Sequence, residues 1–422
     1  MAAEHVNTLI VGGGQAGLAM SAHLSKRGIG HLVLERDRIA ETWRSARRTS
    51  LVANGPAWHD RFPAKEFADT GPDDFASAQS VVTYFEEFAR ETGAPVRCGT
   101  EVQSVRRAAQ GMGFRAETSQ GPVTADHVVA ATGPFQLPAI PPVIPQTAGL
   151  LQIHSSDYRD PGGVPEGAVL VVGAGSSGAQ IAEELSLAGR RVYLSVGPHD
   201  RPPRRYRGKD FVWWLGCLGK WQMKTPPAGS EHVTIAVSGA RGGRTVDFRR
   251  FAHAGITLLG MTQGCRDGVV QIAPDLAGNI ARGDADYLAL LDEADAYVAA
   301  GGADLPPDPD ARVLPADPEC LTRPLARLDL AQAGISTVIW ATGYEQDFGW
   351  LQVDAFDAEG RPSHSRGVST EPGVYFLGLP WLSMRGSSFI WGVWEDADYL
   401  SAHIAGGTSG EARRLPVAYP EG

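Results

Sequence analysis

The stretch Thr-Leu-Ile-Val-Gly-Gly-Gly-Gln-Ala-Gly at residues 8–17 decides the fold. Its apolar start is typical of a strand buried in a parallel sheet. Gly12, Gly14 and Gly17 then follow the pattern G-x-G-x-x-G, and an apolar helix is expected directly after them. The first glycine allows a tight turn, the second lets a pyrophosphate approach the backbone, and the third lets the helix pack closely on the strand. The N–H groups at the start of that helix attract phosphate.

The residues after this loop complete a dinucleotide-binding unit. A second strand is expected over 31–34, and Glu35 stands at its end, 18 residues after Gly17. A carboxylate at this position accepts hydrogen bonds from a ribose diol. A G-x-G-x-x-G pattern alone is a weak signal, but the two strands, the helix and the spaced acid together predict a bound nucleotide.

The same pattern recurs over 168–185, with a following strand expected over 191–195. Its three glycines are Gly173, Gly175 and Gly178. The second strand ends at Ser195 instead of an acid, and three arginines follow it: Arg201, Arg204 and Arg205. Ser and Arg bind a 2′-phosphate that an acid would repel, so the second unit is predicted to prefer NADPH over NADH. For each arginine the alternative is a solvated basic loop.

Two such units in one chain predict an α/β protein with two Rossmann-like dinucleotide-binding domains. In tandem proteins of this kind the N-terminal unit usually holds FAD, and the second unit delivers hydride from NADPH. Residues 128–133 and 338–344 both read as apolar strands ending in Ala-Thr-Gly, and they bracket the second unit. We interpret them as the crossings out of the first domain and back. The predicted division is a FAD-binding domain at 1–150 and 335–422, with an NADPH-binding domain inserted at 151–334.

Composition excludes several classes of protein. The chain of 422 residues has 38 Lys and Arg against 48 Asp and Glu, a formal net charge of −10. Such a balance disfavours nucleic acid and anionic membrane as partners. No stretch reaches the roughly 18 apolar residues of a membrane span, and no signal peptide is expected at the N-terminus. The histidines lack paired-ligand spacing, so no metal is predicted.

The cysteines indicate a reduced compartment. Cys98, Cys217, Cys265 and Cys320 form no C-x-x-C or C-x-x-x-x-C pair, which argues against a zinc knuckle or a redox-active dithiol. Mostly buried, reduced thiols in a cytoplasmic protein are the simpler interpretation.

The C-terminal helix and a tryptophan-rich segment each have more than one interpretation. A helix is expected over 389–404 with Asp396 and Asp398 exposed, and the preceding Gly-Ser-Ser at 386–388 would cap it. Aimed inward, this helix would place its positive dipole end near a flavin pyrimidine, although a plain cap accounts for the residues equally well. The tryptophans of 210–224 either fill a domain interface or line a substrate channel.

Together these motifs resemble the class B flavin-dependent monooxygenases, which include flavin-containing monooxygenases, Baeyer–Villiger monooxygenases and YUCCA-type enzymes. The resemblance rests on both glycine patterns, on Ala-Thr-Gly-Pro-Phe at 131–135, Ala-Thr-Gly-Tyr at 341–344 and Tyr-Phe-Leu-Gly-Leu-Pro-Trp at 375–381. Trp43 matches the family's Trp beside the flavin phosphates. His154 and Tyr158 keep the H-x3-Y half of the family fingerprint, and the chain looks nearest to the YUCCA-like branch.

The resemblance implies FAD and NADPH as cofactors, and a flavin hydroperoxide that transfers one oxygen atom from O2 to a small organic substrate. Asn54 falls where relatives place an Asn near the reacting flavin edge, so it is the expected catalytic residue, unless it only forms an Asn-Gly turn. The residues expected to bind the two cofactors are Gly12, Gly14, Gln15, Ala16, Gly17, Glu35, Arg36, Trp43, Arg44, Val102, Thr132, Gly133, His154, Gly173, Gly175, Ser176, Ser177, Gly178, Ser195, Arg201, Arg204, Arg205, Ala341, Thr342, Gly343, Tyr344, Gly378 and Phe389.

Alternatives to this function remain. A two-nucleotide reductase could pass electrons to a quinone or protein, and a nucleotide-binding sensor could gate a partner without chemistry of its own. An aromatic substrate is suggested by five side chains that could form a pocket: Trp213, Trp214, Phe389, Trp391 and Trp394. A homodimer is the default expectation for the assembly.

Overall fold

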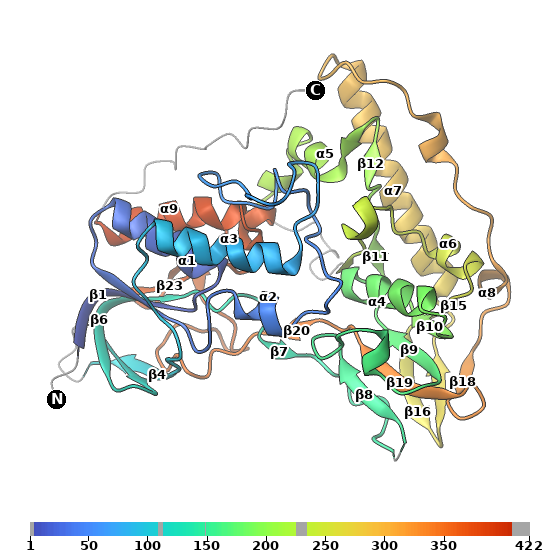
Figure 1. The fold of residues 1–422 in the computed structure, drawn as a ribbon, viewed down its shortest axis with the longest axis horizontal. Helices are drawn as coiled ribbons and strands as arrows, with labels where there is room; N and C mark the ends of the chain where they lie inside the picture. Colours follow the sequence, from blue (N-terminus) through green and yellow to red (C-terminus); the bar gives the residue numbers. More distant parts are fainter. Residues whose placement is uncertain (1–3, 109–112, 148, 225–233, 407–422) are drawn as a thin grey trace.

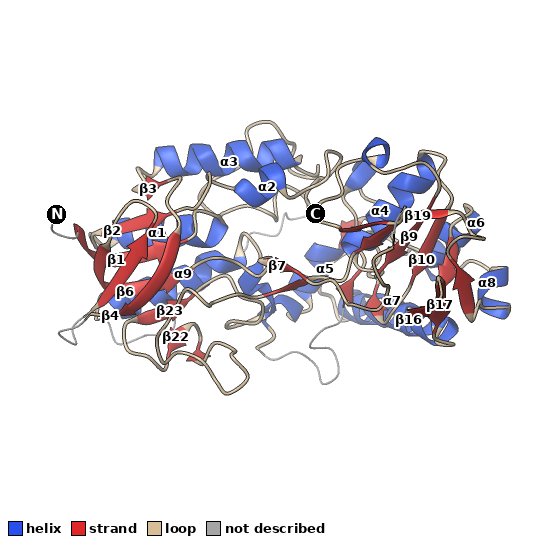
Figure 2. Ribbon diagram, turned by 90° about the horizontal axis from the view of Figure 1, so that it is seen from below, coloured by secondary structure: helices blue, strands red, loops and turns tan. Residues whose placement is uncertain are grey.

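Two mainly parallel sheets, each with its own helices, form two lobes in the computed structural model (Figures 1 and 2). The structure describes residues 4–108, 113–147, 149–224 and 234–406. We call the lobe around β1 the first lobe and the lobe around β9 the second lobe. The mixed α/β fold predicted from the sequence is confirmed.

The first lobe contains a nine-stranded sheet in the described residues, with the order β21-β22-β23-β6-β1-β2-β3 and the pair β4-β5 attached to β6. Its parallel strands are β1 (Glu4–Val11), β2 (His31–Leu34), β3 (Val96–Arg97), β6 (Val123–Ala130) and β23 (Val374–Phe376). Antiparallel strands are β4 (Val102–Arg107), β5 (Phe114–Thr118), β21 (His364–Ser365) and β22 (Val368–Ser369). Its helices are α1 (Gln15–Lys26), α2 (Glu41–Ser45), α3 (Ala78–Glu91), α9 (Gly392–Ile404) and the 3-10 turn η5 (Arg385–Ser388).

The second lobe has a five-stranded parallel sheet with the order β15-β10-β9-β19-β8. These strands are β8 (Leu151–His154), β9 (Ala168–Val172), β10 (Val192–Ser195), β15 (Thr257–Leu259) and β19 (Ile335–Trp340). Its helices are α4 (Ser176–Leu187), α5 (Phe211–Cys217), α6 (Phe248–His253), α7 (Leu276–Ala299) and α8 (Glu319–Thr322), with short 3-10 turns η1 (Pro161–Gly163), η2 (Lys220–Gln222), η3 (Ala240–Gly242) and η4 (Pro309–Arg312). A small antiparallel sheet joins β16 (Thr262–Arg266), β17 (Val269–Ile272) and β18 (Arg327–Asp329). Short pairs are β11 (His199–Asp200) with β14 (Thr234–Ile235), and β12 (Arg205–Tyr206) with β13 (Lys209–Asp210).

Both sheets grow outward from a central glycine-turn strand. In the first lobe β1 lies between β2 and β6, and in the second lobe β9 lies between β10 and β19. The order in which strands are added to the sheet therefore changes direction beside each glycine turn. Ligands of open α/β sheets bind at the carboxyl ends of the strands at such a switch point. Strand β9 is fully buried, which accounts for its continuous apolar sequence.

The connections between the lobes differ from the prediction in one respect. Strand β19 was assigned to the first domain by the boundary at 334, but it pairs with β8 and β9 in the second sheet. The predicted boundary is wrong by the length of this strand, because an apolar run shows that a strand is buried but not which sheet it joins. The outward and return connections run side by side, with β7 (Leu137–Pro138) antiparallel to β20 (Tyr344–Glu345).

The C-terminal helix also begins later than expected. The α-helix starts at Gly392, since residues 385–388 form the turn η5. The sequence predicts an exposed Asp396, but this residue is completely buried, whereas Asp398 is half-buried and lies 2.8 Å from the guanidinium of Arg27, the residue that caps the end of α1. These contacts hold α9 against α1, side by side in Figure 1. In the part of the chain that is described, no helix combines the length and the apolar character needed to cross a membrane.

Candidate functional site

The two glycine turns have the same geometry. Gly12 and Gly173 adopt φ of +112° and +106°, values that L side chains rarely take. A Cβ on Gly12 would lie 2.6 Å from the carbonyl oxygen of Ala131, and one on Gly173 would lie 2.4 Å from that of Ala341. Each turn therefore packs directly on an Ala-Thr-Gly segment, at the end of β6 or of β19. The residues must be glycines because neighbouring backbone fills the space of a side chain.

The third glycine of each pattern packs against the first. A Cβ on Gly17 would lie 1.9 Å from the Gly12 carbonyl oxygen, and a Cβ on Gly178 would lie 1.8 Å from that of Gly173. This close approach brings α1 and α4 onto their strands, as predicted for the pattern.

The middle glycines leave the helix starts open. Gly14 and Gly175 are the N-cap residues of α1 and α4, and no side chain caps either helix. A Cβ on Gly14 would meet no protein atom within 4 Å. Uncapped N–H groups and the helix dipole attract an anion, so the start of α1 fits a pyrophosphate.

Glu35 lies beside the first turn. Its Oε2 accepts a hydrogen bond from the Gly13 N–H at 2.6 Å, and its Oε1 accepts one from the Asp37 N–H at 2.9 Å. These bonds fix the carboxylate at the end of β2, next to the open helix start. A carboxylate has further lone pairs, so Glu35 fits the role of ribose acceptor.

The carboxyl end of the first sheet collects several other residues predicted to bind a cofactor. Gln136 Nε2 donates to Thr132 Oγ1 at 3.0 Å and to the Gly133 carbonyl at 2.7 Å. Gly378, which follows β23, approaches Ala16 so closely that its Cβ would lie 2.9 Å from the Ala16 Cβ. The Gln15 side chain donates to the Ser388 carbonyl at 2.7 Å, which joins the glycine turn to the segment before α9.

Four further residues predicted to bind a cofactor have partners of their own elsewhere in the first lobe. Arg44 lies 2.6 Å from Glu86 on α3, and Arg36 lies 3.1 Å from Asp37 at the surface. Trp43 is half-buried and packs on the core of the first lobe. Val102 begins β4 and pairs with Thr118.

His154 clamps the second Ala-Thr-Gly segment. Its ring is completely buried, its Nε2 lies 2.9 Å from the Gly343 carbonyl and its Nδ1 lies 2.9 Å from the Ser156 hydroxyl. Burial lowers its pKa, so the ring is neutral at pH 7, with Nε2 donating to the carbonyl. Tyr344 packs edge-on against the same ring at 4.8 Å. The Thr342 hydroxyl donates to the Ala139 carbonyl, so this turn is tied to both connections between the lobes.

Three residues predicted to bind the 2′-phosphate lie in the interior instead. The Ser195 hydroxyl is buried and donates to the Gly260 carbonyl at 2.9 Å. Arg201 forms a buried ion pair with Asp284, and Arg204 forms one with Asp210. Buried charges need such partners, which the local sequence pattern did not reveal. Only Arg205 of the three arginines is exposed, with its guanidinium 3.2 Å from the Gly242 carbonyl.

Asn54 lies where the lobes meet. Its side-chain oxygen accepts from Gln180 Nε2 at 3.0 Å, and its carbonyl accepts from the Arg204 guanidinium at 2.6 Å. Gln180 belongs to the first turns of α4, and Ser176 at the start of that helix donates its hydroxyl to the Ile235 carbonyl at 2.8 Å. These contacts therefore link the Asn54 loop to α4, the helix that follows the second glycine turn.

The five aromatic residues expected to share a pocket divide among three clusters. Trp213 and Trp214 pack with Tyr206 and Tyr287 in the second lobe, and Trp394 packs in the core of the first lobe. Phe389 and Trp391 lie in a third cluster that contains residues of both lobes, which we call the bridging cluster: Phe211, Val212, Leu215, Trp221, Val237, Leu290, Met384 and Trp391, with Trp58, Leu218, Ile235 and Phe389 against them. The prediction of a single pocket lined by all five side chains is therefore wrong.

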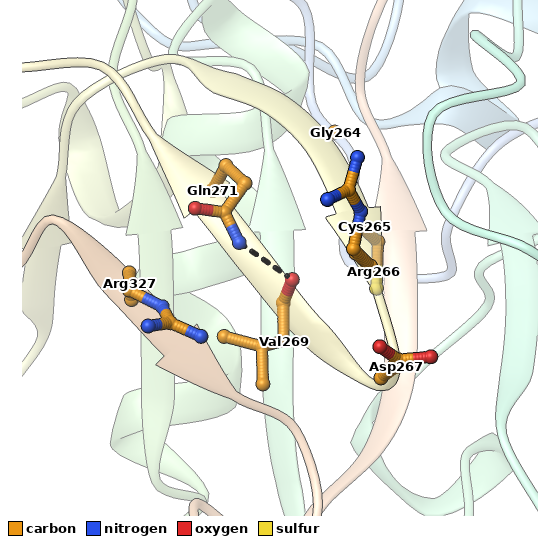
Figure 3. A pocket seen from close by; sticks show the side chains of 7 residues that line it. All are labelled: Gly264, Cys265, Arg266, Asp267, Val269, Gln271 and Arg327. Carbon is orange, nitrogen blue, oxygen red and sulfur yellow. Dashed lines mark hydrogen bonds between the residues drawn. The ribbon is translucent and has the colours of Figure 1, made fainter.

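A hollow of about 610 Å³ opens elsewhere, on the small sheet of β16, β17 and β18 (Figure 3). Arg266 and Arg327 line it, and the Gln271 side chain donates to the Val269 carbonyl at 3.2 Å. It contains none of the residues predicted to bind a cofactor, so the glycine turns and not this hollow define the candidate site.

Comparison with known proteins fits this geometry. A family model described as pyridine nucleotide-disulphide oxidoreductase matches residues 9–215, which include both glycine turns. An uncharacterized CzcO-like oxidoreductase of Geobacillus kaustophilus is 33% identical over 399 residues, covering 94% of this chain and 97% of the relative. The chain belongs to the CzcO-like oxidoreductases.

This CzcO-like chain is also similar to flavin monooxygenases, in part of its sequence and in its fold. Indole-3-pyruvate monooxygenase YUCCA1 of Oryza sativa is 33% identical to this chain over 192 residues, covering 44% of this chain and 47% of that enzyme. A mutant flavin monooxygenase from Stenotrophomonas maltophilia superimposes with a TM-score of 0.66 at 19% identity, covering 96% and 99% of the two chains. Bacillithiol disulfide reductase from Bacillus cereus has a TM-score of 0.59 at 16% identity, covering 96% and 99%. The fold is thus shared by oxygenases and reductases.

The site of this CzcO-like chain includes residues that the sequence did not single out. Gln136 and Gln180 are two such residues, and each holds a turn or loop of the site by its side-chain amide. His59 has no recognisable spacing to other residues, and it lies in contact with the bridging cluster. No local pattern marks such residues, because their partners are distant in sequence.

Proposed function

We propose that this CzcO-like oxidoreductase is an NADPH- and FAD-dependent monooxygenase that inserts one oxygen atom from O2 into a small organic substrate. The pair of matching glycine turns, each resting on an Ala-Thr-Gly segment at a switch point, carries the assignment of two nucleotides. The similarity to indole-3-pyruvate monooxygenase and to flavin monooxygenases favours oxygen transfer over reduction of another acceptor. FAD is assigned to the first lobe, through the open start of α1 and Glu35. NADPH is assigned to the second lobe, which is inserted between β6 and β23 of the first.

The chain's residues have distinct tasks in this proposal. FAD supplies the electron transfer and oxygen activation when bound. Gly12, Gly14 and Gly17 shape the anion site, and Glu35 binds the ribose. Asn54, fixed by Gln180 and Arg204, presents its amide at the junction of the lobes, where the nicotinamide and the substrate would meet the flavin. The overall balance is NADPH, a proton, O2 and substrate giving NADP⁺, water and oxygenated substrate.

An oxygen-trapping measurement tests this function without knowledge of the substrate. The FAD-loaded protein is reduced with NADPH under anaerobic conditions and then mixed with O2, while O2 consumption and H2O2 release are followed together. A monooxygenase is expected to consume O2 seconds before H2O2 appears, because activated oxygen is held for the substrate. Simultaneous O2 loss and H2O2 release, with rapid reduction of an added quinone, would instead identify a reductase.

Arg205 tests the assignment of NADPH to the second lobe. Replacing Arg205 with glutamine is expected to raise the KM for NADPH about tenfold, because a guanidinium–phosphate contact is a charge-assisted hydrogen bond. The KM for NADH should not change, since NADH lacks the 2′-phosphate. Steady-state flavin reduction with both nucleotides measures the ratio. Arg323→Gln, at an exposed arginine that follows α8 and pairs with Glu319, is the matched control. Equal changes for the two nucleotides would contradict the role of Arg205.

A further inference from the structure

The buried His59 and the adjacent, partly buried Asp60 form a hydrogen-bonded dyad next to the Asn54 loop. The Nδ1 atom of His59 lies 2.7 Å from the Asp60 carboxylate, whose other oxygen accepts from the Gly55 N–H at 2.8 Å. An ionised carboxylate only accepts hydrogen bonds, so Nδ1 of the imidazole carries the proton. In the neutral ring, the Nε2 atom is consequently left as a hydrogen-bond acceptor.

This acceptor is buried without a partner. Nε2 of His59 is inaccessible and makes no hydrogen bond within the described residues. The ring is surrounded by indoles, with centroid distances of 5.3 Å to Trp221, 5.5 Å to Trp58 and 5.6 Å to Trp391. Unsatisfied buried polar atoms are rare in native structures and call for a ligand, an ion or water.

The neighbouring Trp391 supplies a complementary group. Its indole Nε1–H is also buried, and it too lacks a hydrogen-bond acceptor in the described part of the chain. Trp391 is the N-cap residue of α9, so both side chains lie near the start of that helix. One acceptor and one donor are thus left open within a single aromatic environment.

His59 and Trp391 lie in a suitable place to contact a substrate. The ring centroids of Trp221 and Phe389 are 5.0 Å apart, and the two residues come from different lobes. The bridging cluster therefore spans the junction between the two assigned cofactor units. Gln15 of the first glycine turn reaches the Ser388 carbonyl next to Phe389. The Asp60–Gly55 hydrogen bond connects His59 to the Asn54 loop, so the cluster adjoins both this loop and the segment that Gln15 contacts.

We propose that His59 Nε2 and Trp391 Nε1–H form the polar pair of a substrate subsite for planar aromatic compounds that carry an N–H or O–H group. The substrate group donates to His59, and an acceptor on the substrate, where present, takes the Trp391 N–H. This inference rests on the proposed function and specifies its substrate class. Both atoms are buried, so entry of the substrate ring requires a neighbouring side chain to move, and the half-buried Phe389 beside Trp221 is the one we assign.

Indole and N-methylindole test the subsite as probes, because they differ in the N–H group and share the aromatic ring. Isothermal titration is performed on the oxidised, FAD-loaded protein without NADPH. The unmodified protein is expected to bind indole about tenfold more tightly than N-methylindole. His59→Phe keeps an aromatic ring but lacks the acceptor, so it should bind the two probes equally. His59→Gln, which retains an acceptor oxygen, should keep part of the preference. His253→Gln, at a surface histidine of α6, is the control.

The outcomes distinguish a substrate subsite from a hydrated pair of polar atoms and from a cofactor contact. Equal binding of both probes by the unmodified protein would mean that water satisfies the two atoms, which overturns the proposal. A preference that survives His59→Phe would overturn it as well. Loss of FAD affinity in His59→Phe, measured by flavin fluorescence, would assign the pair to the cofactor instead. Because the titration needs no turnover, a preference for indole together with simultaneous O2 loss and H2O2 release would refute the monooxygenase and leave the subsite standing.

Discussion

Replacing Gly14 with alanine is expected to weaken FAD binding about a hundredfold while leaving the fold intact. Gly14 has φ of −87° and ψ of −165°, which alanine adopts without strain, and an added Cβ would meet no protein atom within 4 Å. The methyl group would instead occupy the space through which a pyrophosphate approaches the start of α1, and it would push the phosphates away from the N–H groups. Equilibrium titration of the apoprotein with FAD, followed by flavin fluorescence, measures the affinity.

The other glycines sharpen this test. Gly30→Ala is the matched control, because a Cβ there also meets no atom within 4 Å but lies away from the turn. Gly17→Ala is instead expected to destabilise the fold, since its Cβ would lie 1.9 Å from the Gly12 carbonyl oxygen and would force α1 away from its strand. Thermal unfolding of the apoproteins should therefore be unchanged for Gly14→Ala and strongly lowered for Gly17→Ala. Normal FAD affinity in Gly14→Ala would show that the cofactor does not use this helix start.

Local patterns predicted the parts of the fold that local chemistry determines. The strand over 31–34 and the helix after the first glycine turn lie where expected, because apolar runs and glycine spacing act within one unit. Strand β19 was placed in the wrong sheet, since its partners β8 and β9 are far earlier in the chain. A sequence pattern specifies burial of such a strand but not the sheet that buries it.

The same distinction between local sequence and distant partners applies to the residues of the site. Glycine turns are recognisable because backbone geometry demands glycine at these positions. Arg201 and Arg204 match a phosphate-binding pattern in the sequence, but the folded second lobe buries each of them against a carboxylate, Asp284 or Asp210, that no local pattern links to them. No sequence pattern marks His59, because its distinctive property is a buried nitrogen without a hydrogen bond in the described residues, and that property arises only when Trp221 and Trp391 pack around it.

Replacing Asp396 with asparagine is expected to stabilise the protein by about 1–3 kcal/mol at pH 8. Burial raises the pKa of Asp396 to about 6, against about 3.9 for an unfolded Asp, while hydrogen bonds from Ser383 and Ser387 oppose this shift. Between these two values the folded state binds more protons than the unfolded state, so stability falls as pH rises from about 4 to about 6. Above that range the buried charge costs stability in full, and asparagine removes the charge but still accepts a hydrogen bond from Ser383.

Urea unfolding of the Asp396→Asn variant and the unmodified protein from pH 4 to pH 8 measures this effect, and the difference should shrink towards zero at pH 4. Asp398→Asn provides a control of opposite sign on the same helix. His23 and Arg27 hold the pKa of Asp398 below its usual range, so its carboxylate stabilises the fold at pH 8 and loses that effect as the pH falls below about 4. The two variants should therefore separate in opposite directions at pH 8. A loss of stability in Asp396→Asn at that pH would mean that the fold uses the buried negative charge, and a cationic partner for it at the start of α9 would then have to be sought.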